Sequence, residues 1–165
     1  MTGQSTEPKP PPWLPPRWFI RGAWVAHRAI HRFTGGRRGL ALPTPGGKFG
    51  YLRLKTVGRR SGQERAAILG YYEDGPDLIT LAMNGWADAE PAWWLNLQAH
   101  PDASVELKNG SRAVRGRAAE GEERARLWAK LRAYSGYGDD LEGYARLRSS
   151  ETAVIVLEPR PANAG

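Results

Sequence analysis

Short apolar runs separated by turn-forming residues dominate the chain from residue 49 onward. They predict six β-strands, at 49–57, 63–72, 78–83, 103–108, 111–119 and 152–157. Asn109-Gly110 is a strong hairpin signal, and 73–77 is a turn by composition. The run 152–157 is apolar throughout, which indicates a central strand. Because βαβ spacing is absent, the expected fold class is mainly β with helices (α+β), a closed or split β-barrel of about six strands.

Three segments of the same region have helical periodicity instead. They are 91–100, 122–134 and 141–147, the last with the weakest pattern. Pro91 is favourable as the first residue of its helix, and Pro101 stops that helix. In the second segment, one apolar face is formed by Leu127, Trp128, Leu131 and Tyr134. We therefore expect two or three helices inserted between the strands.

The N-terminal region has a different pattern. Residues 1–16 include six prolines and predict a disordered or polyproline-like tail. Residues 17–33 repeat apolar side chains at helical spacing, with arginines on the opposite face. Such a basic amphipathic helix is typical of a protein lying on an anionic membrane surface, and it also suits a helix packed on the body with its arginines in water. Residues 17–48 thus form a helix and linker, and 49–161 the barrel domain.

Net charge separates the same parts. The chain carries +7, yet residues 1–48 hold eight Lys or Arg against one acidic residue, and residues 49–165 hold sixteen of each sign. The barrel domain is therefore neutral and lacks a recognised nucleic-acid motif, which argues against nucleic-acid binding. The absence of cysteine excludes thiol chemistry and permits a reducing, cytoplasmic compartment. No apolar run approaches the ~20 residues of a membrane-spanning helix, so membrane contact would be peripheral, on the inner face of the cell membrane.

Residues that catalyse difficult reactions unaided are scarce. His27 and His31 have i,i+4 spacing, but no glutamate lies between them and no third ligand is near in sequence, so no metal site is expected. His100, at a helix end, is expected to be structural. There is no Gly-x-Ser-x-Gly motif for serine hydrolysis. A bound organic cofactor would supply the missing reactivity.

Cations concentrate in one predicted turn within 51–65. Its four cations and two hydroxyl residues are Lys55, Arg59, Arg60, Arg65, Thr56 and Ser61. Gly58 and Gly62 permit a tight turn because glycine readily adopts positive φ. Such a turn gathers N–H groups and cations on one side, which suits a phosphate or carboxylate. The alternative is a solvated basic hairpin tip.

A second candidate region is the loop and helix start at 84–96. It offers backbone N–H groups at a helix N-terminus and the indoles of Trp86, Trp93 and Trp94 as a wall for a flat ring. Alternatively, Trp93 and Trp94 belong to the core. We expect this of at least one of them, since neighbouring helical positions point about 100° apart.

Five segments match a known family in order and spacing. KTVGRRSGQER, AMNGWADAEPAWWLNLQAHPDA, VRGRAAEGEERARLW, YSGY and VIVLEPR, between residues 51 and 160, resemble the deazaflavin (F420)-dependent nitroreductase family of actinobacteria. The resemblance implies a split β-barrel of the flavin-reductase, FMN-binding kind. It also implies coenzyme F420, an 8-hydroxy-5-deazaflavin whose polyanionic tail carries a phosphodiester and several glutamates.

The resemblance further implies roles for particular residues. The tail would be held by Lys55, Arg59, Arg60 and Ser61. The deazaflavin ring would be lined by Met83, Asn84, Gly85, Trp86, Pro91, Ala92, Trp93 and Trp94, with Asn96 supporting them. Tyr134 and Tyr137 correspond to the family's tyrosine pair on the substrate side, and we predict that one of them protonates or hydrogen-bonds the acceptor oxygen. For Tyr134, the alternative is that it only completes the apolar helix face.

The expected function is hydride transfer from reduced F420 to a small organic acceptor, a quinone, an enone or a nitroaromatic. Family members that reduce nitro compounds tend to have serine–lysine–glycine–glycine where this chain reads Met83-Asn84-Gly85-Trp86, so nitroreduction of a specific drug does not carry over. The alternatives are the same barrel with FMN, which has one phosphate and no glutamate tail, and a non-enzymatic module that binds F420 or a membrane surface. Monomer and homodimer both remain open.

Overall fold

The computed structural model describes residues 16, 39–134 and 140–161. The amphipathic segment 17–33 and Tyr137 lie outside these residues, as does the proline-rich tail apart from Pro16. The described part contains the whole predicted barrel domain except 135–139.

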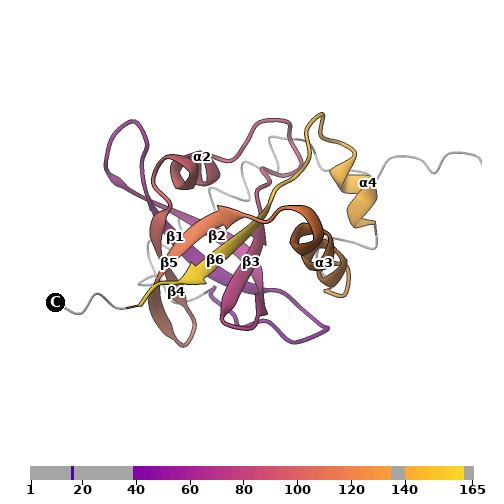
Figure 1. Cartoon of the computed structure of the whole chain (residues 1–165), viewed down its shortest axis with the longest axis horizontal. Helices are drawn as coiled ribbons and strands as arrows, with labels where there is room; N and C mark the ends of the chain where they lie inside the picture. Colours follow the sequence, from indigo (N-terminus) through magenta and orange to yellow (C-terminus); the bar gives the residue numbers. More distant parts are fainter. Residues whose placement is uncertain (1–15, 17–38, 135–139, 162–165) are drawn as a thin grey trace, which may run out of the picture.

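Six antiparallel strands close into a barrel in the order β1-β2-β3-β6-β5-β4 (Figure 1). The strands are β1 (Gly50–Val57), β2 (Glu64–Asp74), β3 (Asp77–Leu81), β4 (Asp102–Leu107), β5 (Gly110–Ala118) and β6 (Val154–Pro159). β4 returns to pair with β1, with Leu54 opposite Val105, and this pairing closes the barrel. The predicted β-barrel with helices is confirmed.

Two turns and one strand end differ from the sequence prediction. The β4–β5 turn is Lys108-Asn109 and not Asn109-Gly110, because Gly110 already pairs with Leu107. β2 continues to Asp74 and pairs with β3, so the turn predicted at 73–77 contains only Gly75-Pro76, with Gly75 at φ 61°. β3 ends at Leu81 and not at residue 83. Met83 turns back there and donates its N–H to Leu81 O at 2.9 Å.

Apolar side chains form two clusters, one on each face of the strands. The first fills the barrel with Leu52, Leu54, Leu69, Tyr71, Leu78, Val105, Leu107, Val114, Ile155 and Leu157, together with side chains from α2 (Ala92–Ala99). The second lies between the outer face of the strands and two helices, α3 (Gly121–Leu131) and α4 (Leu141–Ala145). Ile155 and Leu157 of β6 join the first cluster, whereas Val154 and Val156 join the second. Burial on both faces therefore explains why 152–157 is apolar throughout.

α2 closes one end of the barrel (Figure 1). Leu97 of α2 packs where β5 has Gly116, and a Cβ at that glycine would lie only 2.8 Å from Leu97 Cδ1. The helix prediction is confirmed in position but wrong for Pro91. Pro91 is the extended N-cap (φ −66°, ψ 140°) rather than the first helical residue, and its carbonyl accepts the N–H of Trp94 at 3.0 Å.

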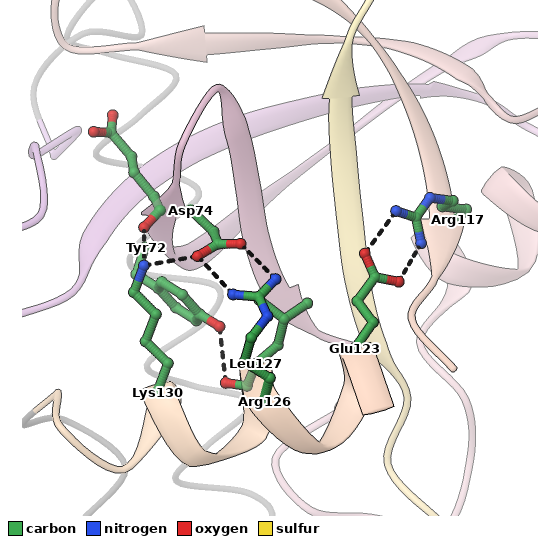
Figure 2. Close-up of polar contacts among 8 residues, drawn as sticks. Tyr72, Asp74, Arg117, Glu123, Arg126, Leu127 and Lys130 are labelled. Carbon is green, nitrogen blue, oxygen red and sulfur yellow. Dashed lines mark hydrogen bonds and ion pairs between the residues drawn. The ribbon is translucent and has the colours of Figure 1, made fainter. Parts of the chain in front are cut away.

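α3 is attached to β2 by a carboxylate between two cations (Figure 2). Asp74 accepts hydrogen bonds from Arg126 at 2.9 Å and Lys130 at 2.9 Å. The bond from Arg126 is the main reason that the Asp74 pKa falls to about 2. Below this pair, Tyr72 donates its hydroxyl hydrogen to Leu127 O at 2.8 Å.

A second ion pair holds the start of the same helix. Arg117 of β5 donates to both carboxylate oxygens of Glu123, at 2.7 and 2.8 Å (Figure 2). It also donates to Glu158 of β6 at 2.6 Å. These hydrogen bonds raise the Arg117 pKa and lower the Glu123 pKa. We call the set Asp74, Arg117, Glu123, Arg126 and Lys130 the α3 clamp.

α3 and α4 are shorter than predicted. α3 ends at Leu131 and α4 at Ala145, where the sequence pattern suggested 134 and 147. Tyr134 nevertheless packs in the second cluster. Among the described helices, none is long and apolar enough to cross a membrane.

Candidate cofactor-binding site

The turn between β1 and β2 is tight and closed by its own backbone. Gly58 donates to Gln63 O at 2.8 Å, and Gly62, at φ 67°, donates to Gly58 O at 2.8 Å. A Cβ at Gly58 would lie 2.7 Å from Ser61 Oγ and 3.2 Å from Gln63 O, so a side chain there would force the turn to shift. The predicted strand–turn–strand is therefore confirmed, and we call residues 58–63 the basic turn.

The basic turn presents two guanidinium groups. Arg59 and Arg60 are exposed, and neither has an ion-pair partner among the residues that the structure describes. The Ser61 hydroxyl oxygen is used inside the turn, where it accepts from Gln63 N at 3.3 Å and Arg65 Nη2 at 3.4 Å. Arg59 and Arg60 are thus the groups of this turn best placed to meet a solvent-borne anion.

Lys55 is in a different environment. It lies on the outer face of β1, and its Nζ is 2.6 Å from Glu106 Oε1 and 3.8 Å from Glu64 Oε1. The hydrogen bond to Glu106 is the main cause of a raised Lys55 pKa. Arg53 bonds the other oxygen of Glu106 at 3.3 Å. The cations that look equivalent in sequence are therefore divided, because Lys55 already has carboxylate partners.

Asn96 of α2 connects the helix to the basic turn. Its amide is buried; Oδ1 accepts the N–H of Arg59 at 3.1 Å, and Nδ2 donates to Thr56 Oγ1 at 3.2 Å. The turn is therefore held against α2 at the residue that carries the first exposed guanidinium. Asn96 was expected to support the ring wall, and the structure shows its amide bound to the turn.

The loop after β3 bends sharply at two consecutive residues. Gly85 has φ 57° and Trp86 has φ 61°. Positive φ is easy for glycine but costs a large side chain about 1–3 kcal/mol, so surrounding contacts must hold Trp86 there. The Trp86 indole is buried in the second cluster and stacks on Tyr144 at 5.9 Å. Its neighbours Met83 and Asn84 are half-buried and exposed.

The indoles predicted to line a ring are buried in the apolar clusters. Trp93 and Trp94 are both buried in the barrel cluster, which extends the core alternative to both of them. Pro91 is buried as well, whereas Ala92 is exposed. Of the residues predicted to line the ring, those that keep accessible surface are Met83, Asn84, Gly85 and Ala92.

Tyr134 is a packing residue in this structure. Its ring is 7% exposed and stacks on Phe49 at 5.3 Å and on Tyr72 at 5.0 Å. This fits the alternative that Tyr134 completes the apolar face of α3. Tyr137, its predicted partner, lies outside the described residues.

Arg148 is a central residue of this region that sequence patterns did not reveal. It follows α4, and its side chain is completely buried. It donates to three backbone carbonyls, one hydroxyl and one carboxylate, belonging to Ala82, Ala87, Asp88, Thr152 and Glu90. In the sequence, an arginine followed by two serines at the end of a weak helix pattern indicates an exposed side chain. The sequence pattern at 147–152 therefore gave little indication that Arg148 is buried.

Metal-ligating side chains do not gather in the described part of the chain. No group of three histidine or carboxylate side chains is placed to hold a metal ion within residues 39–134 and 140–161. His100 is the exposed C-cap of α2. His27 and His31 lie outside the described residues.

Comparison with known proteins identifies relatives of this chain. Residues 24–159 match the family described as F420H(2)-dependent quinone reductase. An F420H(2)-dependent quinone reductase of Mycobacterium tuberculosis is 35% identical over 95 residues, which are 55% of this chain and 62% of that relative. The match thus spans less than two thirds of that relative. A putative F420H(2)-dependent quinone reductase of the same organism is 32% identical over 110 residues, 66% of this chain and 89% of that relative.

Solved structures agree on the fold. An F420-H2-dependent reductase superposes with a TM-score of 0.58 at 24% identity, covering 72% of this chain and 97% of that chain. A structure described as a domain-swapped dimer superposes with a TM-score of 0.61 at 22% identity, covering 84% and 99%. The expected F420-dependent family is confirmed by the sequence matches: the chain belongs to the F420H(2)-dependent quinone reductase family.

Proposed function

We propose that this protein transfers a hydride from reduced F420 to a quinone-type acceptor. The observation that carries the proposal is a pair of exposed arginines, Arg59 and Arg60, on a turn whose backbone is bound to α2 by Asn96. Because the family is F420-dependent, we take the polyanionic F420 tail as the ligand of this arginine pair.

The residues present fit such a tail. Guanidinium groups bind phosphate and carboxylate oxygens in pairs, and neither Arg59 nor Arg60 must first leave a partner among the described residues. Lys55 would join them only by giving up Glu106. FMN has a single phosphate and would use less of this charge, which makes it the second candidate.

The ring would lie against the loop that follows β3 and the start of α2. Met83, Asn84, Gly85 and Ala92 offer accessible surface there, while Trp86, Trp93 and Trp94 form the packed layer behind it. Pro91 and Asn96 contribute by fixing the helix start and the turn. When bound, reduced F420 supplies a hydride. The work of the chain is to orient ring and acceptor and to exclude water.

A quinone that receives a hydride also needs one proton to become a hydroquinone. We assign that proton, or a hydrogen bond to the acceptor oxygen, to the Tyr137 phenol. Tyr134 suits a supporting role, since its ring is stacked on Phe49 and Tyr72. We favour a quinone over a nitroaromatic because Met83-Asn84-Gly85-Trp86 lacks the lysine found in nitro-reducing members.

One titration tests the cofactor. Purified protein is mixed with oxidised F420, whose fluorescence is followed, with FMN in parallel. We expect saturable binding of F420 in the micromolar range and weaker binding of FMN. Preference for FMN would support the second candidate, and binding of neither would overturn both. Turnover is then followed with reduced F420 and a water-soluble benzoquinone.

The basic N-terminal segment adds a location to the proposal. Residues 17–33 would hold the enzyme on the inner, anionic membrane surface, where lipid-soluble quinones are found. Deleting residues 1–33 should abolish sedimentation with anionic liposomes at low salt. If the full-length protein never sediments with them, the membrane part of the proposal is wrong and the cofactor part stands.

A further inference from the structure

Arg148 donates hydrogen bonds to four residues of the segment that leads from β3 to α2. Its Nη1 donates to Ala82 O at 3.1 Å, Nε to Ala87 O at 3.0 Å, and Nη2 to Asp88 O at 3.4 Å. Nη2 also binds Glu90 Oε1 at 2.9 Å. We call residues 82–90 the β3–α2 loop. Four of the five acceptors of Arg148 belong to it, and the fifth is Thr152 Oγ1 at 3.0 Å.

Because Arg148 is buried, the loss of any of these hydrogen bonds would be costly. The Arg148 side chain has no exposed surface, and a buried guanidinium is tolerated only where its hydrogen bonds and charge are satisfied. Its charge is balanced by Glu90 alone within the described contacts, and its remaining donors need the loop carbonyls. The loop conformation and the burial of Arg148 therefore depend on one another.

Two further bonds close the same region. Ser149 donates its N–H to Asp88 Oδ1 at 2.6 Å, and Ala82 donates its N–H to Ala153 O at 2.9 Å. The segment after α4 is thus hydrogen-bonded to the first residue of the β3–α2 loop, Ala82, and to Asp88 near the end of the loop. Trp86, with its positive φ, lies between these two contacts in the sequence.

The direction of the peptide groups follows from the same contacts. In a trans peptide the C=O and the next N–H point in opposite directions. Because the carbonyls of Ala87 and Asp88 face the guanidinium, the N–H groups that follow them face away from it. Arg148 therefore sets which edge of the loop backbone is presented outward.

We propose that Arg148 is a positioning residue for cofactor binding: it holds the β3–α2 loop in the shape that receives the ring. The inference rests on the proposed function, because it takes this loop as the ring wall. Arg148 itself, fully buried, touches no ligand. It acts through the loop, and losing it should loosen residues 82–90 while the two apolar clusters, which do not include it, stay packed.

The test compares Arg148→Lys with Arg124→Lys. Lysine keeps the charge, but the three N–H donors on its single nitrogen cannot replace the five hydrogen bonds of the guanidinium. Arg124 is the control: like Arg148 it binds Thr152, through the carbonyl oxygen at 3.0 Å, and it pairs with Glu151 at 2.8 Å. Among the described residues it makes no hydrogen bond to the β3–α2 loop. Hydrogen–deuterium exchange is measured on the protein without cofactor, and F420 affinity by fluorescence.

We expect Arg148→Lys to accelerate exchange of residues 82–90 by about tenfold or more, with strand amides of β1 and β4 unchanged. Its F420 dissociation constant should rise by about tenfold, while Arg124→Lys leaves both quantities near the wild type. Unchanged loop exchange would overturn the inference. So would faster exchange spread evenly over the barrel, or a loosened loop with unaltered F420 affinity.

Two outcomes need a second measurement. If Arg148→Lys does not fold, Glu90→Gln, which keeps the shape and removes the charge, decides the matter by the same loop exchange and affinity. If the wild type does not bind F420, the proposed function fails, and the exchange data still decide whether Arg148 holds the loop.

Discussion

The basic turn and the α3 clamp both contain two arginines, and their surroundings are opposite. Arg59 and Arg60 are exposed and have no ion-pair partner among the described residues. Arg117 and Arg126 each bind a carboxylate, at 2.7 and 2.9 Å (Figure 2). The same type of side chain is therefore left available to an external anion in one place and holds a helix to a barrel in the other.

The difference shows which arginines can bind a ligand. Protein carboxylates already neutralise Arg117 and Arg126, so an incoming anion would have to displace them. The basic turn offers charge without such competition, and Asn96 fixes its backbone. We therefore expect mutations in the turn to change binding and mutations in the clamp to change stability.

The largest effect should come from the double substitution Arg59→Ala with Arg60→Ala. Loss of two charge-assisted contacts should weaken F420 binding by roughly 100-fold, while the melting temperature stays within about 1 °C because exposed charges stabilise little. The control is Lys108→Ala, an exposed cation in the β4–β5 turn, at the opposite end of β1 by strand register. Equal losses in both variants would show that only net charge matters.

The clamp should respond in stability. Arg117→Met leaves Glu123 and Glu158 without their shared partner. We expect the free energy of unfolding to fall by ~1–2 kcal/mol and F420 affinity to change less than about twofold. Urea unfolding measures the first quantity. Arg115→Met, on the same strand with one bond to Asp102 at 3.0 Å, is the control. A larger loss of affinity than of stability in Arg117→Met would contradict the comparison.

Asp74 adds a pH dependence to the clamp. Its folded pKa of about 2 is below the ordinary value of 3.8, so its contribution to stability is present above the ordinary value and is lost as pH falls through the folded one. After screening by solvent, Asp74→Asn should cost about 1 kcal/mol at neutral pH, and the difference from wild type should shrink below about pH 4.

Asp77 should change stability with pH in the opposite direction to Asp74. Burial raises its pKa, so any stability it contributes is present at low pH and is lost as pH rises through the folded pKa. Asp77→Asn should therefore be neutral or stabilising at pH 7. Urea unfolding of both variants between pH 3 and 7 checks the pair. Parallel pH profiles would mean that the clamp does not act through Asp74.

The smallest predicted effect comes from a substitution that frees a paired cation, Lys55, from its main carboxylate partner. Glu106→Gln removes the carboxylate that binds Lys55 at 2.6 Å, so Lys55 becomes available beside the basic turn. F420 affinity should rise by about threefold, a fraction of a kcal/mol. Glu64→Gln, whose carboxylate is 3.8 Å from Lys55, should change affinity less. Weaker binding in Glu106→Gln would show that Glu106 positions Lys55 and does not compete for it.

Local patterns alone predicted much of this protein. Alternation in β1, the hairpin signal at Asn109-Gly110 and the apolar run of β6 predicted strands close to where they lie. Such patterns depend on residues close in sequence, whereas the pairing of β6 with β3 and β5 does not follow from them. Segment order also predicted the family, which the comparisons confirm. The roles of the individual site residues stay predictions.

Only the tertiary structure decided what each side chain meets. Arg126 binds a carboxylate 52 positions away, and Arg148 binds one 58 positions away. Trp93 and Trp94 belong to the barrel core for a related reason, since α2 closes a barrel whose strands come from both sides of it in sequence. Burial and ion pairing are set by distant partners, so a sequence pattern can predict where arginines and indoles occur but cannot say which remain available for a ligand.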